Sequence, residues 1–276
     1  MQNNSDSRSR FSWHRVAEVA AFYAPTTNRL LLVYFLFSLL FAVVTLLPLP
    51  EYAQVGLFSL NWTAIPLMFE LAPIALAKNG DSRIIERLIP ATPTEKFVYY
   101  LLFFTIVVGA AIYLLPWLAL NLYEFIPSVH SPMASKIFEM KLSNPWMLEI
   151  ANGLTVIATC YTCLYVVFKA RTGRVVKGVI AVFVMQIVIG MIGAITGFTV
   201  AFSQGYTDGV NGVPANPEEV SRNVVDQMSS TPYLSIMIAV AAVYIVGVLC
   251  LFYRNLRARI IKNVKAGVAD LEQVLA

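Results

Sequence analysis

The chain has few of the side chains that most catalytic and metal sites use. Its 276 residues include only two histidines, His14 and His130, and three cysteines, Cys160, Cys163 and Cys250. The cysteines all lie inside apolar runs, where a reactive thiolate would be desolvated. A zinc site or a disulfide framework needs converging partners that this composition does not offer. We therefore expect no metal site, and we interpret Cys160 and Cys163, despite their redox-like spacing, as two packed and inert thiols.

Charge is also scarce. Charged residues make up 13% of the chain and hydrophobic residues 58%, whereas soluble domains are about 25% charged, and the mean hydropathy is +0.68. These values predict an integral membrane protein. The net charge is only +4 and the basic residues form short blocks, so we expect no nucleic-acid partner. The polar start of the chain lacks the apolar core and cleavage site of a signal peptide, and we expect it to remain on the mature protein.

Sequence motifs for catalysis are missing as well. The chain contains no Walker A sequence, no nucleophile elbow, no His-Glu-x-x-His helix and no acidic metal cluster. We therefore predict that it is not an enzyme and that it binds no cofactor itself. An intramembrane enzyme is the poorest alternative, because no nucleophile and base, and no set of metal ligands, can be identified.

Long apolar runs dominate what is present. Six of them approach or exceed the ~20 residues that cross a hydrocarbon core of ~30 Å. They are Leu30–Leu49, Val55–Ala77, Phe97–Leu120, Trp146–Phe168, Val179–Ala201 and Tyr233–Tyr253. The runs lack the alternation of barrel strands, and open sheet edges cannot be satisfied in lipid. We predict an all-α, polytopic bundle of six transmembrane helices. The single transmembrane domain 1–276 would comprise an N-terminal segment (1–29), the membrane bundle (30–253) and a cytoplasmic tail (254–276).

The basic residues are distributed unevenly between the two sides of this bundle. Seventeen of the twenty lysines and arginines fall in the segments of one side, and only Lys136, Lys141 and Arg222 fall on the other. Short cytoplasmic loops carry an excess of Lys and Arg. The pattern therefore predicts that both termini, and the loop between the second and third runs, are cytoplasmic.

Both ends of the chain carry helical periodicity. Between Phe11 and Tyr23, apolar residues alternate with polar ones at helical spacing, which favours a helix lying in the headgroup region over a soluble polar tail. After the last run, apolar residues recur three or four positions apart. These are Leu256, Ile260, Val264, Val268, Leu271 and Leu275. The tail either continues the sixth helix into the cytoplasm or lies on the membrane, and the pattern fits both alternatives.

The loop between the second and third runs, 78–96, contains its own helix signals. Asp81 can cap a short helix through Ser82–Ile89, which ends before Pro90. Thr92, Pro93 and Glu95 then place a Thr at the N-cap, Pro at the first helical position and Glu at the third. This is the reciprocal capping box, and it predicts where the third membrane helix starts.

Glu70 is the clearest polar group at membrane depth. A charged residue near the centre of a membrane helix costs about 2.5–3.5 kcal/mol on insertion scales, so Glu70 needs a partner or a proton. Pro66 and Pro73 share its side of the helix, and each proline frees the carbonyl four residues before it. Two interpretations stay open: a group that lines a transport pathway, or a protonated or paired carboxyl that only joins helices. Candidate partners for the second interpretation are Asn152 and Gln186.

Small residues form a stripe in the fifth run. Gly190, Gly193, Ala194 and Gly197 make two overlapping small-x-x-x-small pairs, a pattern that permits close contact with another helix. We interpret the stripe as helix packing rather than as a ligand groove.

The arrangement as a whole resembles the permease subunit of bacterial ABC-2 type exporters. The shared features are six spans, cytoplasmic termini, an interfacial N-terminal helix and a short cytoplasmic helix between spans two and three. Residues 87–97, RLIPATPTEKF, are similar to the signature of one group of such subunits: leucine, any residue, Pro-Ala-Ser, two residues, Glu-Lys-Phe. Thr92 replaces the usual Ser and keeps its capping hydroxyl.

This resemblance implies a transport subunit in the bacterial cytoplasmic (inner) membrane. A separate ABC ATPase subunit would bind ATP and Mg, and a second permease subunit, identical or different, would complete the pathway. The closing ATPase would push on the 81–89 helix, whose Asp81, Arg83, Glu86 and Arg87 would be the coupling residues. The alternative is a non-transporting membrane scaffold or assembly protein that docks cytoplasmic partners.

Overall fold

The computed structural model describes residues 11–45, 66–76, 91–110, 145–170, 172–210, 223–224 and 226–275. Every regular element in these ranges is helical. The helices are α1 (Trp13–Thr45), an unlabelled helix at Pro66–Leu76, α4 (Pro93–Leu102) with its π-helical continuation η2 (Phe103–Val107), α7 (Pro145–Lys169), α8 (Arg174–Val210) and α10 (Thr231–Leu275). The predicted all-α class is confirmed for this part of the chain.

Three of the described helices are long and apolar enough to cross a membrane. They are Trp146–Lys169, Arg174–Thr207 and Thr231–Ala258, and they coincide with the last three predicted spans. The first three predicted spans run partly outside the described residues, and their described portions are helical. The structure therefore supports a membrane protein, whereas the number of six spans and their orientation stay predictions.

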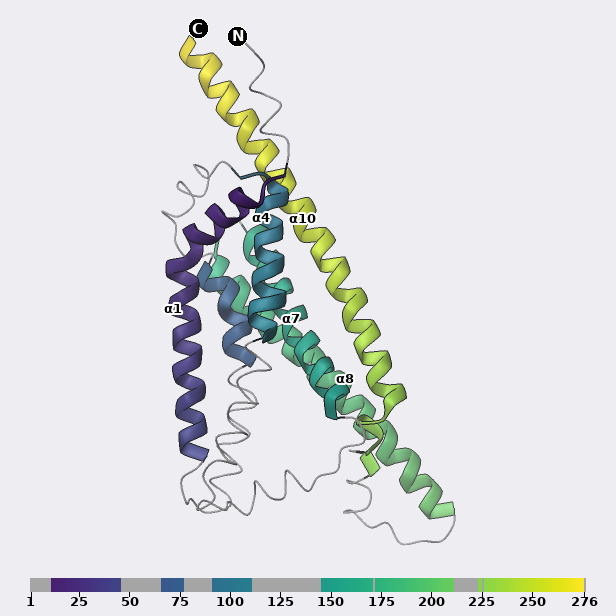
Figure 1. The fold of residues 1–276 in the computed structure, drawn as a ribbon. Helices are drawn as coiled ribbons and strands as arrows, with labels where there is room; N and C mark the ends of the chain where they lie inside the picture. Colours follow the sequence, from purple (N-terminus) through teal and green to yellow (C-terminus); the bar gives the residue numbers. More distant parts are fainter. Residues whose placement is uncertain are drawn as a thin grey trace.

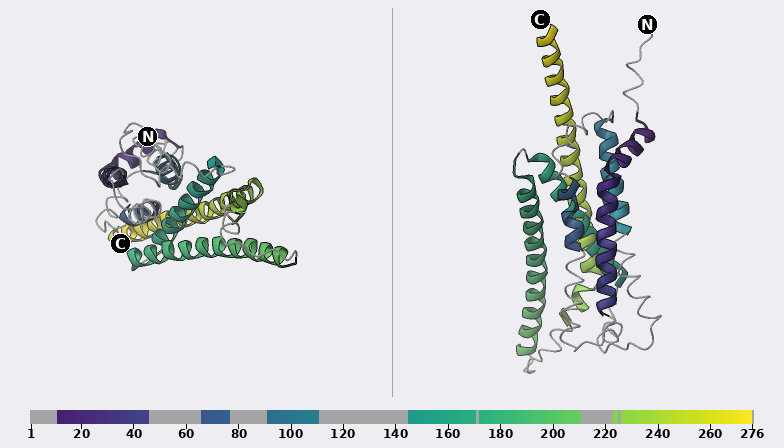
Figure 2. Two further views of the ribbon diagram at one scale, coloured as in Figure 1. Left: turned by 90° about the horizontal axis from the view of Figure 1, so that it is seen from below. Right: turned by 90° about the vertical axis from the view of Figure 1, so that its left-hand side faces the viewer.

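The helices lie lengthwise in one bundle and alternate in direction (Figures 1 and 2). The starts of α1, α4 and α8 and the end of α7 lie toward the end of the bundle from which α10 protrudes. Basic residues lie at or near these four helix ends: Arg15, Lys96, Lys169 and Arg174. Blocks of positive charge that are far apart in the sequence thus gather at one end of the bundle.

Aromatic side chains fill the space where α4, α7 and α10 meet. The rings of Tyr100, Phe168 and Phe252 pack edge to face, with centroids 5.3 to 5.7 Å apart. Tyr100 is fully buried and Phe252 is nearly so. Such pairs contribute about 0.5–1.5 kcal/mol each beyond the area that they bury. This aromatic cluster makes the start of α4 part of the packed core.

The predicted interfacial helix and the first apolar run form one bent helix, α1 (Figure 1). Pro25 inside it lacks an N–H and leaves the carbonyl of Ala21 without its helical donor. The hydroxyl of Thr27 also donates to the carbonyls of Tyr23, at 3.1 Å, and Ala24, at 3.3 Å, a contact that bends helices. The proline and the threonine together account for the bend.

The apolar positions of the first part of α1 are divided between two surroundings. Val16, Val19 and Tyr23 are buried against the rest of the protein, and Phe11 and Trp13 are exposed. Periodicity alone shows that a helix has an apolar face, but it does not show whether protein or membrane covers that face. Most of the stripe that suggested a headgroup location is therefore used for packing within the chain.

At its other end the chain forms one continuous helix. α10 extends from Thr231 to Leu275, so the tail continues the sixth predicted span instead of folding back. A helix rises 1.5 Å per residue, so the part after Ala258 extends about 25 Å beyond the apolar segment. Figures 1 and 2 show it protruding beyond every other helix.

Gly178 lies where α8 approaches two other helices most closely. A Cβ atom at this position would lie 2.7 Å from Cγ2 of Val167 in α7 and 2.8 Å from Cγ1 of Ile74. The backbone here also receives a hydrogen bond, because Sγ of Cys163 donates to the Gly178 carbonyl at 3.7 Å. Only a glycine fits this position without a shift of its neighbours.

The packing predicted for Gly190, Gly193 and Gly197 is not found within the described part of the chain. No atom lies within 4 Å of a Cβ built at Gly190 or Gly193, and Gly197 has only Cγ1 of Val224 at 3.7 Å. A stripe of small residues permits close approach but does not supply the partner helix. The close glycine contact of α8 occurs instead at Gly178, nearer the start of the helix.

We predict that Gly178→Ala destabilises the protein by roughly 1–3 kcal/mol, because the added methyl group overpacks the contact with Val167 and Ile74. The measurement is the thermal unfolding midpoint of the purified protein in detergent. Gly190→Ala is the matched control, because open space surrounds that position, and alanine favours a helix over glycine by up to ~1 kcal/mol. Equal midpoints for the two variants would contradict the packing described here.

Candidate functional site

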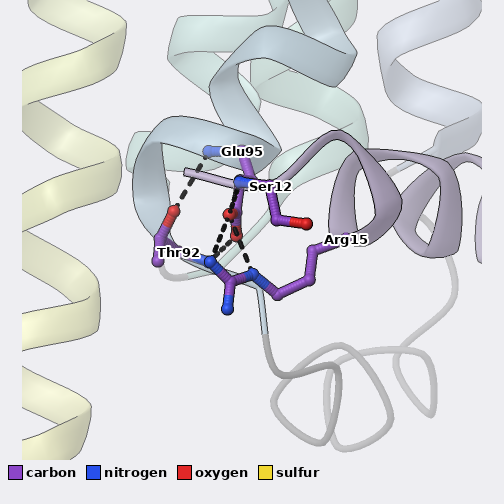
Figure 3. A network of polar contacts seen from close by, with 4 residues as sticks. All are labelled: Ser12, Arg15, Thr92 and Glu95. Carbon is purple, nitrogen blue, oxygen red and sulfur yellow. Dashed lines mark hydrogen bonds and ion pairs between the residues drawn. The ribbon is translucent and has the colours of Figure 1, made fainter. Parts of the chain in front are cut away.

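Within the described residues, two sites contain a buried carboxyl group. The first, here called the Glu95 cluster, consists of Ser12, Arg15, Thr92 and Glu95 (Figure 3). The second, the Glu70 pair, consists of Glu70 and Gln186. Both contain a carboxyl group with almost no exposed surface. Burying a carboxylate costs free energy unless it is paired or hydrogen-bonded, so the partners of each carboxyl group matter.

The Glu95 cluster begins with the local chemistry of the α4 start. Thr92 has an extended backbone, and its hydroxyl accepts a hydrogen bond from the N–H of Glu95 at 3.3 Å. In return, Oε2 of Glu95 accepts from the N–H of Thr92 at 2.7 Å. Pro93 occupies the first helical turn, where its missing N–H has no cost. The capping box expected from Thr92, Pro93 and Glu95 is thus present.

The same carboxylate also binds the start of α1. Its Oε1 accepts from the N–H of Ser12 and from Nε of Arg15, both at 2.8 Å, and Nη2 of Arg15 lies 2.8 Å from the same oxygen. Ser12 directly precedes α1, so its N–H is close to the free N–H groups of that helix start. Arg15 and Glu95 are 80 positions apart in the chain. No local spacing could therefore have identified Ser12 and Arg15 as partners of Glu95.

These contacts keep Glu95 ionised. Burial by itself raises the pKa of Glu95, but the hydrogen bonds from Arg15 and from the backbone of Thr92 and Ser12 outweigh it, and the net pKa is lowered. The partial positive charge at the start of each helix acts in the same direction. The Glu95 carboxylate therefore carries a negative charge in a buried position, and the guanidinium group of Arg15 balances it.

In the Glu70 pair, a side-chain amide is hydrogen-bonded to the buried carboxyl group. Nε2 of Gln186 in α8 lies 2.7 Å from Oε1 and 2.6 Å from Oε2 of Glu70. Of the two partners considered from the sequence, Gln186 is the one that bonds, and Asn152 is exposed. No salt bridge joins Glu70 to a basic residue within the described ranges. The pair joins the Pro66–Leu76 helix to α8, and a pathway role stays open beside this joining role.

Two side chains from neighbouring helices donate hydrogen bonds to backbone carbonyls next to Glu70 and so hold its helix in place. Pro73 leaves the carbonyl of Phe69 without its helical donor, and Sγ of Cys160 in α7 lies 3.4 Å from it as a donor. The hydroxyl of Tyr34 in α1 donates to the carbonyl of Met68. The buried Cys160 is thus a hydrogen-bond donor between helices. Pro66 is the first described residue of this helix, and the carbonyl that it would free, at Trp62, lies outside the described residues.

A π-helical turn in the third predicted span was not foreseen from the sequence. In η2, the cap N–H of Val108 bonds to the carbonyl of Phe103, five residues earlier. The hydroxyl of Tyr161 in α7 lies 2.6 Å from that of Thr105 and donates to the carbonyl of Leu101 at 3.3 Å. Such turns occur often at functional sites. The tyrosine supports the irregular backbone from the neighbouring helix.

The predicted coupling helix lies outside the described residues. This applies to Asp81, Arg83, Glu86 and Arg87 alike. The described chain resumes at Ala91 and reaches the Glu95 cluster directly. The cluster is therefore the first described feature after the predicted coupling segment.

We predict that acid weakens the contact between α1 and α4. Because the pKa of Glu95 is lowered in the folded protein, its contribution to stability is complete above the usual value of 4.5 and is lost as the pH falls below it. Glu95→Gln should lower the unfolding midpoint at neutral pH, and the stability should fall by roughly 1.5–3 kcal/mol, the range for hydrogen bonds to charged groups. The same variant should flatten the midpoint's acid dependence. A parallel pH profile for variant and parent would contradict the prediction.

Comparison with known proteins gives no match: no protein-family model, no curated protein and no solved structure is similar to this chain.

Proposed function

We propose that the chain is the permease subunit of an ABC-2 type exporter in the bacterial cytoplasmic membrane. It would move its substrate together with a second permease subunit and a separate ABC ATPase that holds ATP and Mg. The observation that supports this proposal best is the Glu95 cluster. It fixes the start of α4, and it lies directly after the segment that the resemblance makes the coupling helix.

The position of the cluster suits the transmission of force. Only Pro90, Ala91 and Thr92 separate the end of the predicted 81–89 helix from the first turn of α4. A long flexible linker would absorb a displacement, whereas a capped helix start with a buried ion pair passes it on. A push on the 81–89 helix would therefore act on the third span instead of unravelling its first turn.

The Glu70 pair supplies a second feature that a transporter can use. Ionisable residues inside membrane helices are rare and most often mark substrate or ion pathways. Glu70 is 1% exposed, and its partner Gln186 is an exposed residue of α8. A movement of α8 relative to the Pro66–Leu76 helix would separate the two side chains and break their hydrogen bonds.

The length of α10 favours the scaffold alternative. A helix that extends about 25 Å past the membrane segment offers a surface on which a cytoplasmic partner can dock without any transport. Both functions predict that partners bind. Only the transporter predicts that the membrane chain changes the rate of ATP turnover by a bound ATPase.

The coupling role predicts that Arg83→Glu with Arg87→Glu abolishes binding of the ABC ATPase. The double change alters the helix by four charge units, and like charges facing each other at an interface cost several kcal/mol, against ~0–1 kcal/mol for a solvated pair. The measurement is co-purification of an ABC ATPase encoded beside this chain, together with its stimulated ATP turnover.

The matched control is Arg254→Glu with Arg257→Glu. It makes the same change of charge on exposed residues of α10, and we expect the ATPase to bind this variant normally. Membrane yield of each variant shows whether the chain still folds. The coupling role would be contradicted if the Arg83 and Arg87 variant reached normal membrane yield and still bound and stimulated the ATPase as the parent chain does.

The pathway role of Glu70 predicts that one substitution lowers ATP turnover and that another lowers membrane yield. Glu70→Gln keeps the shape and the hydrogen bond to Gln186 but removes the charge, so stimulated ATP turnover in proteoliposomes should fall at unchanged membrane yield. Gln186→Leu leaves the carboxyl group without its donor and should lower the yield instead. Unchanged turnover and yield in both variants would eliminate a role for this pair.

A further inference from the structure

The Glu95 carboxylate divides its two oxygens between two helices. Oε1 receives the donors of the α1 start, Ser12 and Arg15, and Oε2 receives the N–H of Thr92 at the α4 start. In an ordinary capping box the glutamate serves only its own helix. Here one side chain accepts hydrogen bonds from the starts of two helices that are distant in the sequence (Figure 3).

We propose that Arg15 and Glu95 are positioning residues that hold the first part of α1 and the start of α4 as one rigid unit. A displacement of either helix start is then felt by the other. The inference does not depend on transport, because it applies equally to a permease and to a scaffold.

A second attachment point makes the unit rigid. The rings of Tyr23 in α1 and Tyr99 in α4 stack with centroids 5.3 Å apart and an interplanar angle of 10°. The hydroxyl of Tyr100 donates to that of Tyr23 at 2.9 Å. Arg15 and Tyr23 are two helical turns apart, or about 12 Å. A single contact would let the helices pivot, whereas two contacts at this separation fix their relative orientation.

Two exposed aromatic side chains lie where the chain enters α1. Phe11 and Trp13 flank Ser12, are 43% and 64% exposed, and pack edge to face with centroids 5.1 Å apart. Ser12, between them, donates its N–H to Glu95. Whatever moves these two exposed rings therefore acts on the carboxylate through adjacent backbone.

The same helix provides a matched control. Nε2 of His14 lies 3.3 Å from Oε1 of Glu18, but the two side chains are 85% and 42% exposed. Exposed pairs four residues apart contribute little. Glu18→Gln therefore removes a carboxylate from α1 without touching the contact between α1 and α4.

The experiment is hydrogen exchange, followed by mass spectrometry, on the full chain in lipid nanodiscs. It compares residues 13–24 of α1 with residues 93–102 of α4. The decisive variant is Arg15→Met, because Arg15 belongs to α1 alone. If the two starts form one unit, this variant should accelerate exchange about tenfold in both segments. If the pair is only a local cap, exchange rises in α1 and stays parental in α4.

Three further variants complete the test. Glu95→Gln should accelerate both segments, Arg15→Lys should restore most of the protection because it keeps the charge, and Glu18→Gln should change neither segment. Should Glu95→Gln fail to accumulate in the membrane, the comparison of Arg15→Met with Arg15→Lys decides the question alone. Parental exchange at the start of α4 in Arg15→Met would overturn the proposal.

Discussion

The buried charge of Glu95 has to be balanced by a cation and hydrogen-bond donors, because the surrounding core is largely apolar and aromatic. It is met by donors from two helix starts, which makes the burial of the carboxylate and the docking of α1 on α4 a single event. The buried Val16, Val19 and Tyr23 of α1 belong to the same hydrophobic cluster as Tyr99 and Tyr100 of α4. Separating the helices would break this ion pair and its hydrogen bonds, because Ser12 and Arg15 belong to one helix start and Glu95 belongs to the other.

The two buried carboxyl groups differ in what faces them, and this difference assigns them different tasks. Glu95 faces a guanidinium group and backbone N–H groups, which are donors of fixed position. Among the described residues, the hydrogen-bond donor to Glu70 is the amide of Gln186, which belongs to a flexible and exposed side chain. The first site is therefore built to stay closed, and the second contains a charge balance that a proton, a cation or a helix movement can change.

Local chemistry could be predicted from the sequence, whereas contacts between distant segments could not. The capping box at Thr92 and Glu95 depends on residues three apart, and it was found where its spacing indicated. Gln186 was one of two candidate partners named for Glu70, and it is the one that forms the hydrogen bonds. Ser12, Arg15, Gly178 and the π-turn at Phe103–Val107 depend on how helices approach one another, and a hydrophobic pattern contains no information about that.

The start of α4 lies close in sequence to the predicted coupling segment and is in contact with three other helices. The segment from 81 to 89 is followed within a few residues by a helix start that is fixed to α1 and packed on α7 and α10 through Tyr100. A force applied at that segment would therefore meet three helices at once rather than one. Because a packed core does not deform continuously, a response would take the form of a rigid shift of the whole group, and the proposed transport function would use such a shift.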